Sequence, residues 1–260
     1  MSSPAGKPGR RDEIAALVIE KGEVRIDDLV QAFGVSRMTI HRHIEDLARQ
    51  GVLRKLHGAV SAQPSGVYES LIAWRETHAA GAKAALARAV LAEIQPGQAV
   101  ILDDSTTVAA LGPHLGQIDP LTVITNSLGM MQRLSGPEGP QLIALGGDYH
   151  PTYNAFIGHL CETALAGLHV NLAICSASGV SGATALIQDA RAVRVKQAML
   201  KAAARRVLLL DHTKFGKLAL HRFADLTEFD AVYVDRGLAP DTERDLRAAG
   251  VPLILVDEND

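Results

Sequence analysis

Small hydroxyl residues and an aspartate pair follow a short apolar segment in the stretch 102–111, which reads LDDSTTVAAL. Ser105, Thr106 and Thr107 occupy the point where a strand would turn into a helix. Their hydroxyls and backbone N–H groups would then surround a helix N-terminus, where anions such as phosphate bind well. The same residue types also cap helices that bind nothing, so this stretch alone leaves both interpretations open.

Four further apolar segments end in polar or glycine-rich turns, which read TNS, GGDYH, SASG and DHTKFGK. In a parallel sheet these turns would meet at one edge. Thr125 and Asn126 would supply hydrogen bonds there, and Lys214 would supply the cation that a phosphorylated ligand needs. Gly146 and Gly147 would permit close approach of the backbone. The alternatives are that Asn126 fixes a turn and that Lys214 is a solvated charge.

A second group of candidate residues lies in RMTIHRHIEDLARQ, residues 37–50. On a helical wheel, Ile40, Ile44 and Leu47 share the face that must point into a small core, so Arg42 and Arg49 face away. An exposed face of this kind, behind a tight turn, can enter the major groove of DNA while nearby cations hold phosphates. Solvated arginines are the alternative. The candidate DNA contacts are Ser36, Arg37, Met38, Thr39, His41, Arg42, Arg54, Lys55 and His57.

The elements that position these DNA contacts are three helices and a hairpin. Apolar residues at helical spacing predict helices over 11–22, 26–34 and 37–50, with glycine or a capping serine at their ends. The segment VLRKLHGAVSA at 52–62 is short and β-prone around a glycine, which indicates a hairpin. This order is typical of a winged helix-turn-helix domain.

The rest of the chain alternates apolar strands with helical stretches, which indicates an α/β sheet covered on both faces and a Rossmann-like fold. The predicted strands are AVILDD at 99–104, LTVIT at 121–125, QLIALGG at 141–147, VNLAICSAS at 170–178, RVLLLD at 206–211, AVYVD at 231–235 and PLILVD at 252–257. The predicted helices include 84–94, 127–134, 190–204 and 241–250. We expect a DNA-binding domain at 1–61, a linker at 62–78 around Pro64 and Gly66, and an effector-sensing domain at 79–260.

Composition limits the class of protein. The 260 residues carry a net charge of −3, but residues 1–60 hold ten Lys and Arg against eight Asp and Glu, so the first part is slightly basic. No apolar run is long enough to span a bilayer, and MSSPAGKPGRRDE has no apolar core of a secretion signal, so we expect a soluble cytoplasmic protein. Cys161 and Cys175 lack metal-site spacing and are interpreted as core residues. We expect no cofactor and no metal.

The stretch 10–60 resembles the DNA-binding domain of the DeoR family of bacterial transcription regulators. The family pattern runs through Ser-x-x-Thr-Ile-Arg-Arg-Asp-Leu to a His-Gly-Gly wing. Ser36, Thr39, Ile40 and Arg42 match that pattern, and so does the His57-Gly58 pair of the wing. Departures are His41 in place of Arg, His43 in place of Asp and Ala59 in place of Gly, and they bear on the operator sequence.

The second part resembles the effector domain of the same family, so the resemblance covers nearly the whole chain. The family shows LDSGTT, TN, GG, a small-Ser-Gly turn, a Val-Lys pair and DSSKFG, where this chain has LDDSTT, TNS, GGDYHPTYNAFIG, SASG, ARAVRVK and DHTKFG. Such domains are similar to sugar-phosphate isomerases and deaminases and sense phosphorylated sugars or related metabolites. With the turns described above, the candidate effector contacts are Asp103, Asp104, Ser105, Thr106, Thr107, Thr125, Asn126, Gly146, Gly147, Asp189, Lys196 and Lys214.

Three positions of the effector domain depart from the family pattern. Asp104 replaces a common Ser and Ser105 a common Gly, which places an extra carboxylate beside the phosphate loop. A carboxylate repels phosphate unless a cation or hydroxyl donor intervenes. Asp104 therefore points away, or the ligand is less anionic or shaped differently from the usual sugar phosphate. Asp189 stands in place of an Asn-x-x-Glu segment at the head of the next helix.

Three functions remain in competition. The first is a repressor of carbohydrate or polyol genes that a phosphorylated sugar releases from operator DNA, as a homodimer or homotetramer. The second is a sugar-phosphate isomerase or deaminase with an accessory DNA-binding domain, because Asp103, Asp104, Asp189, Lys196 and Lys214 include the residue types of acid-base catalysis. The third is an architectural or activating DNA binder. A DNA-reading domain joined to a ligand pocket is already a complete switch, so we favour the first.

Overall fold

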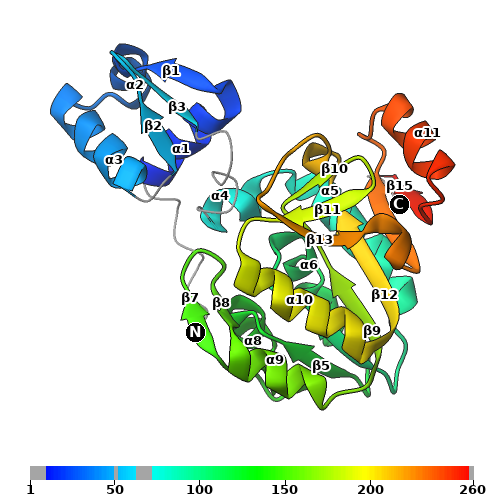
Figure 1. Ribbon diagram of the computed structural model, residues 1–260. Helices are drawn as coiled ribbons and strands as arrows, with labels where there is room; N and C mark the ends of the chain where they lie inside the picture. Colours follow the sequence, from blue (N-terminus) through cyan, green and yellow to red (C-terminus); the bar gives the residue numbers. More distant parts are fainter. Residues whose placement is uncertain (1–9, 50–51, 63–71, 258–260) are drawn as a thin grey trace. The chain divides into compact units, whose positions relative to one another are not determined.

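The computed structural model describes residues 10–49, 52–62 and 72–257, and the chain divides into two units, residues 1–78 and 79–260 (Figure 1). The second unit holds two hydrophobic clusters and the first unit holds one. Part of the segment predicted as a linker is helical, since α4 spans Ile72–Thr77. In the described ranges, no helix has the length and apolar character to cross a membrane.

The first unit has the predicted helices and hairpin. Its helices are α1 (Arg10–Lys21), α2 (Ile26–Phe33) and α3 (Arg37–Arg49), and its strands are β1 (Glu23–Arg25), β2 (Leu53–Lys55) and β3 (Ala59–Ala62). The prediction missed β1, which pairs with β3 and makes the sheet three-stranded, in the order β1-β3-β2. Ile40, Ile44 and Leu47 are buried in the core of this unit, as the helical wheel predicts.

A seven-stranded sheet forms the centre of the second unit, in the order β15-β14-β12-β9-β4-β5-β6. All its neighbouring strands pair in parallel. The strands are β4 (Ala99–Leu102), β5 (Thr122–Thr125), β6 (Gln141–Ala144), β9 (Val170–Cys175), β12 (Ala203–Leu210), β14 (Ala231–Asp235) and β15 (Leu253–Val256). These are the seven strands that the apolar runs predict, and the α/β fold class is confirmed.

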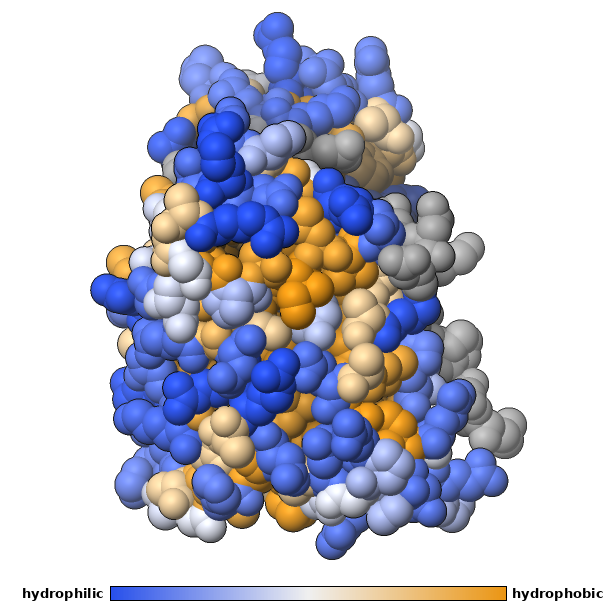
Figure 2. Space-filling model, turned by 90° about the vertical axis from the view of Figure 1, so that its right-hand side faces the viewer, coloured by the Kyte–Doolittle hydropathy of each residue, from blue (hydrophilic) through white to orange (hydrophobic). Residues whose placement is uncertain are grey.

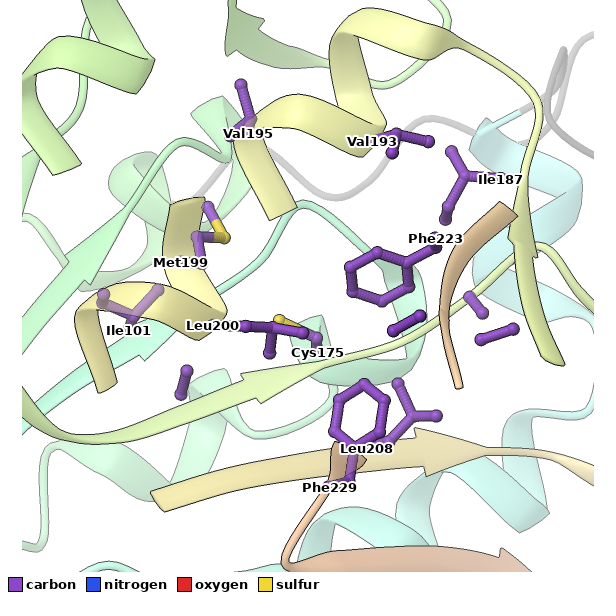
Figure 3. Packing of buried hydrophobic residues seen from close by; sticks show 14 of the residues in the cluster. Ile101, Cys175, Ile187, Val193, Val195, Met199, Leu200, Leu208, Phe223 and Phe229 are labelled. Carbon is purple, nitrogen blue, oxygen red and sulfur yellow. The ribbon is translucent and has the colours of Figure 1, made fainter. Parts of the chain in front are cut away.

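Helices cover both faces of the sheet. Successive side chains of each strand point to opposite faces, so β4 contributes residues to both hydrophobic clusters. In β4, Ile101 lies in the cluster that contains residues of α9 (His159–Ala166) and α10 (Ala190–Ala202) (Figure 3). Its neighbours Val100 and Leu102 lie in the other cluster, with residues of α5 (Ala80–Val90), α6 (Thr106–Ala109), α7 (Gly112–Leu115) and α8 (Leu128–Leu134). Both cysteines are buried in the first cluster, as predicted.

Smaller elements complete the second unit. A three-stranded antiparallel sheet, in the order β10-β11-β13, joins Gly179–Ser181, Thr184–Ile187 and His221–Asp225. The hairpin β7-β8 joins Asp148–His150 to Ala155–Ile157, and α11 spans Pro240–Ala248. Short 3-10 turns occupy Leu91–Glu93, His212–Lys214 and Leu226–Glu228.

The prediction was wrong at the end of α10. The alanine-rich sequence favours a helix to residue 204, but α10 ends at Ala202 and β12 begins at Ala203. Ala203 pairs in parallel with Val170 of β9, so a contact distant in sequence overrides local helix propensity.

Candidate functional site

The turn before α3 is built by a glycine and a serine. Gly34 ends α2 in the left-handed conformation, with φ of 61°, and its N–H donates a hydrogen bond to the Val30 carbonyl. The Ser36 hydroxyl accepts a hydrogen bond from the Thr39 N–H at 3.2 Å and lies 2.9 Å from the Thr39 hydroxyl. Ser36 and Thr39 therefore start α3 in the way an N-cap does.

The outer face of α3 carries the residues proposed to read DNA. The Met38 side chain is 79% exposed and Arg42 is exposed, whereas His41 and Thr39 are half-buried. Arg54 in the wing is exposed as well. The side chain of Arg49 lies outside the described part of the structure.

Two of the predicted cations are held by carboxylates. Arg37 Nη1 lies 3.1 Å from Asp27 Oδ1, and Lys55 Nζ donates to Glu45 Oε1 at 2.8 Å. Exposed ion pairs of this kind contribute little, about 0–1 kcal/mol, so DNA phosphates can compete for both cations.

Four of the predicted DNA contacts, two on α3 and two in the wing, line one depression. Its volume is about 380 Å³, and Arg37, His41, Lys55 and His57 are among its lining residues. Gly58, with φ of 74°, makes the wing turn, and its carbonyl accepts a hydrogen bond from the Ile26 N–H at 3.1 Å. The structure therefore brings α3 and the wing together, as a DNA interface requires.

The predicted effector contacts follow strands of the parallel sheet. Because β4, β5, β6, β9 and β12 run in the same direction, their carboxyl ends lie at one edge. The predicted convergence of the turns on one rim is confirmed. In open α/β sheets this edge is where ligands bind.

A buried lysine joins two aspartates at this edge. Lys196 of α10 donates a short hydrogen bond to Asp103 Oδ2, and its Nζ lies 3.3 Å from Asp104 Oδ1. Asp103 also accepts hydrogen bonds from the backbone N–H groups of Ser176, at 2.7 Å, and Ser105, at 2.9 Å. Lys196 is thus the cation that offsets the extra carboxylate of Asp104.

The charge of Lys196 is fixed by these neighbours. Burial alone would lower its pKa, but the charges of Asp103 and Asp104 and the hydrogen bond to Asp103 outweigh that effect and raise the pKa above its ordinary value. The amine is therefore protonated at neutral pH and has no lone pair for nucleophilic or base chemistry.

The hydroxyl-rich loop starts α6 as predicted. The Ser105 hydroxyl accepts a hydrogen bond from the Val108 N–H at 3.1 Å, and Thr107 is buried. Lys83 of α5, a residue that the prediction missed, is 4% exposed and donates a hydrogen bond to the Thr106 hydroxyl at 3.0 Å. A buried cation therefore lies directly beside the loop proposed to bind phosphate.

Three polar side-chain atoms, each in the residue that immediately follows strand β5, β9 or β12 in the sequence, are buried without a hydrogen-bond partner among the described residues. They are Asn126 Oδ1, Ser176 Oγ and Asp211 Oδ2. Native structures leave few such atoms, because each costs about 1–3 kcal/mol. Asn126 does fix a turn, since its Nδ2 donates to the Phe156 carbonyl at 3.0 Å, but its oxygen is unused. Thr125 is fully buried and accepts a hydrogen bond from the Ser127 N–H.

Positive charge surrounds Asp211. Burial by itself would raise the pKa of Asp211, but the charge of Lys214, a hydrogen bond from Thr213 and the charges of Lys83 and Lys217 lower it. Burial, with the charge of Lys214, lowers the pKa of Lys217 to about 8, against an opposing effect of Asp211. Three lysines near one carboxylate leave an excess of positive charge, which suits an anion.

Of the remaining predicted contacts, Gly147 and Asp189 have structural roles. Gly146 is exposed, and a Cβ at Gly147 would come within 2.5 Å of the Ile157 carbonyl, so β8 requires that glycine. Asp189 caps α10 by accepting hydrogen bonds from the N–H groups of Arg191 and Ala192. Its carboxylate also lies 3.6 Å from His150 Nε2, and burial chiefly lowers the pKa of that histidine.

The residues that sequence reasoning missed are Lys83, Ser176, Asp211 and Lys217. Ser176 and Asp211 lie in turns that the sequence singles out, so their position after apolar strands was a usable signal. Lys83 precedes a predicted helix by one residue, and nothing local distinguishes it from a solvated lysine.

Comparison with known proteins agrees with this architecture. Residues 10–65 match the family model of the DeoR-like helix-turn-helix domain, and residues 78–236 match that of the DeoR C terminal sensor domain. The chain is 32% identical over 248 residues to the "Uncharacterized HTH-type transcriptional regulator YgbI" of Escherichia coli strain K12, covering 95% of this chain and 96% of that protein. It is 29% identical over 229 residues to the glycerol-3-phosphate regulon repressor of the same strain, covering 87% and 90%.

Among solved structures, ribose 5-phosphate isomerase A from Methanocaldococcus jannaschii aligns with a TM-score of 0.37 and 17% identity, over 52% of this chain and 54% of that chain. The two family models together span both units, and the sensor model alone covers more than half of the chain. The chain therefore belongs to the DeoR family of transcriptional regulators.

Proposed function

We propose that this protein is a cytoplasmic repressor of carbohydrate or polyol genes, which a phosphorylated sugar or polyol releases from operator DNA. In this proposal α3 and the wing bind the operator, and the carboxyl edge of the parallel sheet binds the effector. The repressor name of one relative supports the first part. The observation that carries the second part is the set of three buried, unpartnered polar atoms after the strands of this edge, one of which belongs to Asp211, on which the charges of three lysines act.

The two kinds of group at the edge suit two parts of one ligand. Lys83, Lys214 and Lys217 can neutralise a phosphate, which carries about −1.5 to −2 charges at pH 7. Asn126 Oδ1 can accept and Ser176 Oγ can accept or donate hydrogen bonds with hydroxyls of the ligand. A molecule with one anionic end and several hydroxyls matches this arrangement better than an apolar or cationic molecule.

In this proposal the protein senses its ligand and does not catalyse a reaction on it. Aldose-ketose chemistry needs a base at the substrate carbon and a group that polarises the carbonyl. Lys196 is held protonated between Asp103 and Asp104, and these two carboxylates are in turn engaged with it. The ion triad of Lys196, Asp103 and Asp104 therefore suits the positioning of the β4 loop against α10 and not the transfer of a proton.

Self-association is part of the proposal, because paired winged helices must match half-sites about one DNA turn apart. Figure 2 shows an apolar area, in orange, bordered by hydrophilic residues on one face. Apart from that view, Leu160 of α9 and, at another place in the sequence, Leu218 and Leu220 before β13 are each between 65% and 71% exposed. Exposed apolar side chains of this size favour contact with another protein surface, here a second copy in a homodimer or homotetramer.

A thermal unfolding screen tests effector binding. A ligand that binds only the folded state raises the midpoint temperature, by an amount that grows with its concentration. We expect one or more phosphorylated sugars or polyols to raise the midpoint of the full-length protein, and Lys214→Ala to lose that rise. If no phosphorylated compound raises the midpoint at saturating concentrations, the proposed effector class is wrong.

A further inference from the structure

A second cavity lies beside the loop that follows β12. It has a volume of about 580 Å³ and is bounded by one side of α11, the β10-β11 turn and residues 212–216. Its size falls in the range of about 300–1,000 Å³ that small-molecule sites occupy. None of the residues proposed above for the effector lines it, so it is a separate space.

A histidine anchored by a buried carboxylate forms part of its wall. His212 Nδ1 lies 2.6 Å from Asp235 Oδ2, and Asp235 Oδ1 accepts a hydrogen bond from the His212 N–H at 2.6 Å. The Asp235 side chain is 2% exposed, whereas that of His212 is 40% exposed. The carboxylate therefore fixes the imidazole through Nδ1, and Nε2 makes no hydrogen bond within the described residues.

Gly237 leaves room for this pair. A Cβ at position 237 would collide with the His212 ring and approach Asp235 Oδ2 to 2.8 Å, while the Gly237 N–H donates to the same oxygen at 3.1 Å. Close approach of the backbone is thus needed to hold the imidazole against Asp235. The pair is built from three positions around the end of β14 and is not a chance surface contact.

The remaining lining residues define the chemistry of the cavity. Thr242 and Asp245 on α11 are its other polar side chains, and Phe215, Leu238 and Leu246 are among the apolar ones. Among the described residues that line it there is no lysine or arginine, in contrast to the lysine-rich edge of the sheet. An anionic ligand would meet Asp245 without a compensating lysine or arginine, so a phosphate is disfavoured here.

Hydroxyl groups of a ligand can satisfy the hydrogen-bonding side chains of this cavity. Because Asp235 holds Nδ1 of His212, Nε2 is the ring atom that can exchange a hydrogen bond with a ligand hydroxyl, and the Asp245 carboxylate is an acceptor. A molecule with hydroxyls could donate to Asp245, exchange hydrogen bonds with His212 and Thr242, and place its C–H groups against Phe215. We infer that this cavity is a second ligand site, which takes a neutral, hydroxyl-rich small molecule such as an unphosphorylated monosaccharide or polyol.

The test is a titration of the isotopically labelled full-length protein, followed by NMR, with D-glucose, D-galactose and D-glucitol as probes and their 6-phosphates as charged counterparts. We expect at least one neutral probe to shift resonances of residues 212–216 and 242–249 in a saturable way. His212→Ser and Asp245→Asn should each weaken that binding about tenfold or more, since the first removes the imidazole ring and the second replaces a carboxylate oxygen with an amide donor. Lys201→Met, at an exposed position of α10 that does not line this cavity, should leave the binding of the neutral probe unchanged.

Two results would overturn the inference. One is the absence of saturable shifts in these segments with every neutral probe. The other is binding that survives both His212→Ser and Asp245→Asn, or that favours the 6-phosphates at this cavity. Each variant is shown to be folded by an NMR spectrum whose resonances away from the cavity match those of the wild type. Failure here is distinguishable from failure of the proposed effector, because effector binding is measured with phosphorylated compounds by the unfolding midpoint, whereas this cavity is tested with neutral probes and with His212→Ser and Asp245→Asn.

Discussion

The Nζ of Lys196 lies 3.3 Å from Oδ1 of Asp104, so the carboxylate that departs from the family pattern is paired with a cation from α10. The same amine forms an ion pair with Asp103, the residue that immediately follows β4 in the sequence. All three side chains are buried, and the ion triad therefore fastens α10 to the carboxyl edge of the sheet. An effector that moves the loop after β4 would therefore also shift α10, because the ion triad connects the two.

Lys196→Met should destabilise the second unit by about 3–5 kcal/mol, because removal of one partner leaves buried carboxylates without compensation. The measurement is urea unfolding of the full-length protein. Lys201→Met on the exposed side of the same helix is the matched control, and we expect it to change stability by less than about 0.5 kcal/mol. Equal stability of the two variants would show that the triad does not hold the helix.

Arg42→Ala should weaken operator binding by about 1–3 kcal/mol if the guanidinium contacts a base, while the fold and the effector response stay intact. Arg42 is exposed on the outer face of α3 and makes no ion pair within the described ranges, so its loss should leave the core unchanged. Fluorescence anisotropy with labelled operator DNA measures the effect. Arg88→Ala, on an exposed position of α5 in the other unit, serves as control. Operator affinity equal to that of the wild type would remove Arg42 from the recognition surface.

Lys214→Ala should shift the response to much higher effector concentrations and retain DNA binding, because the charge of this lysine acts on Asp211 at the proposed phosphate site. Calorimetric titration with the phosphorylated compound that raises the unfolding midpoint gives the affinity. A loss of about 1.5–3 kcal/mol is expected for a charge-assisted hydrogen bond to phosphate. A variant that responds at the same ligand concentration as the wild type would exclude Lys214 as a phosphate contact.

The affinity for a phosphorylated effector should fall as the pH rises through about 8, where burial and the charge of Lys214 place the pKa of Lys217. The sign follows from the charge: phosphate binds the protonated amine better, and above this pH the free protein has lost that proton. Phosphate itself is doubly ionised above about pH 7 and does not oppose the trend. Titrations between about pH 7 and about pH 9 measure the slope. Lys217→Gln should bind more weakly and nearly independently of pH, and an unchanged slope in this variant would contradict the assignment.

Sequence patterns predicted the parallel sheet well, because its strands are continuous apolar runs that only a doubly covered sheet can bury. Two of the short strands were missed for the opposite reason. Gly179–Ser181 of β10 and Asp148–His150 of β7 have little apolar content, and their pairing depends on partners supplied by the rest of the fold. Residues 203 and 204 show the same limit, since strand pairing there overrides helix propensity.

Sequence patterns predicted part of the candidate site. Polar residues behind strands, such as Asn126 and Lys214, can be found from the order of the elements. The buried partners cannot, because the burial of Lys83 and its hydrogen bond to Thr106 depend on how α5 packs on the sheet. The pairing of Lys196 with Asp104 likewise needs the position of α10 relative to β4.

The most direct test of the proposed switch is the operator affinity of the full-length protein with and without its effector. Operator DNA is selected by the protein from random duplexes, and the dissociation constant is measured by anisotropy at fixed salt concentration, because salt alone changes it strongly. We predict that a saturating phosphorylated sugar or polyol weakens binding by about tenfold or more, as a coupling free energy of about 1–3 kcal/mol implies. If the dissociation constant for operator DNA is the same with and without a ligand that demonstrably binds at the sheet edge, the proposed release of the operator by the effector is wrong.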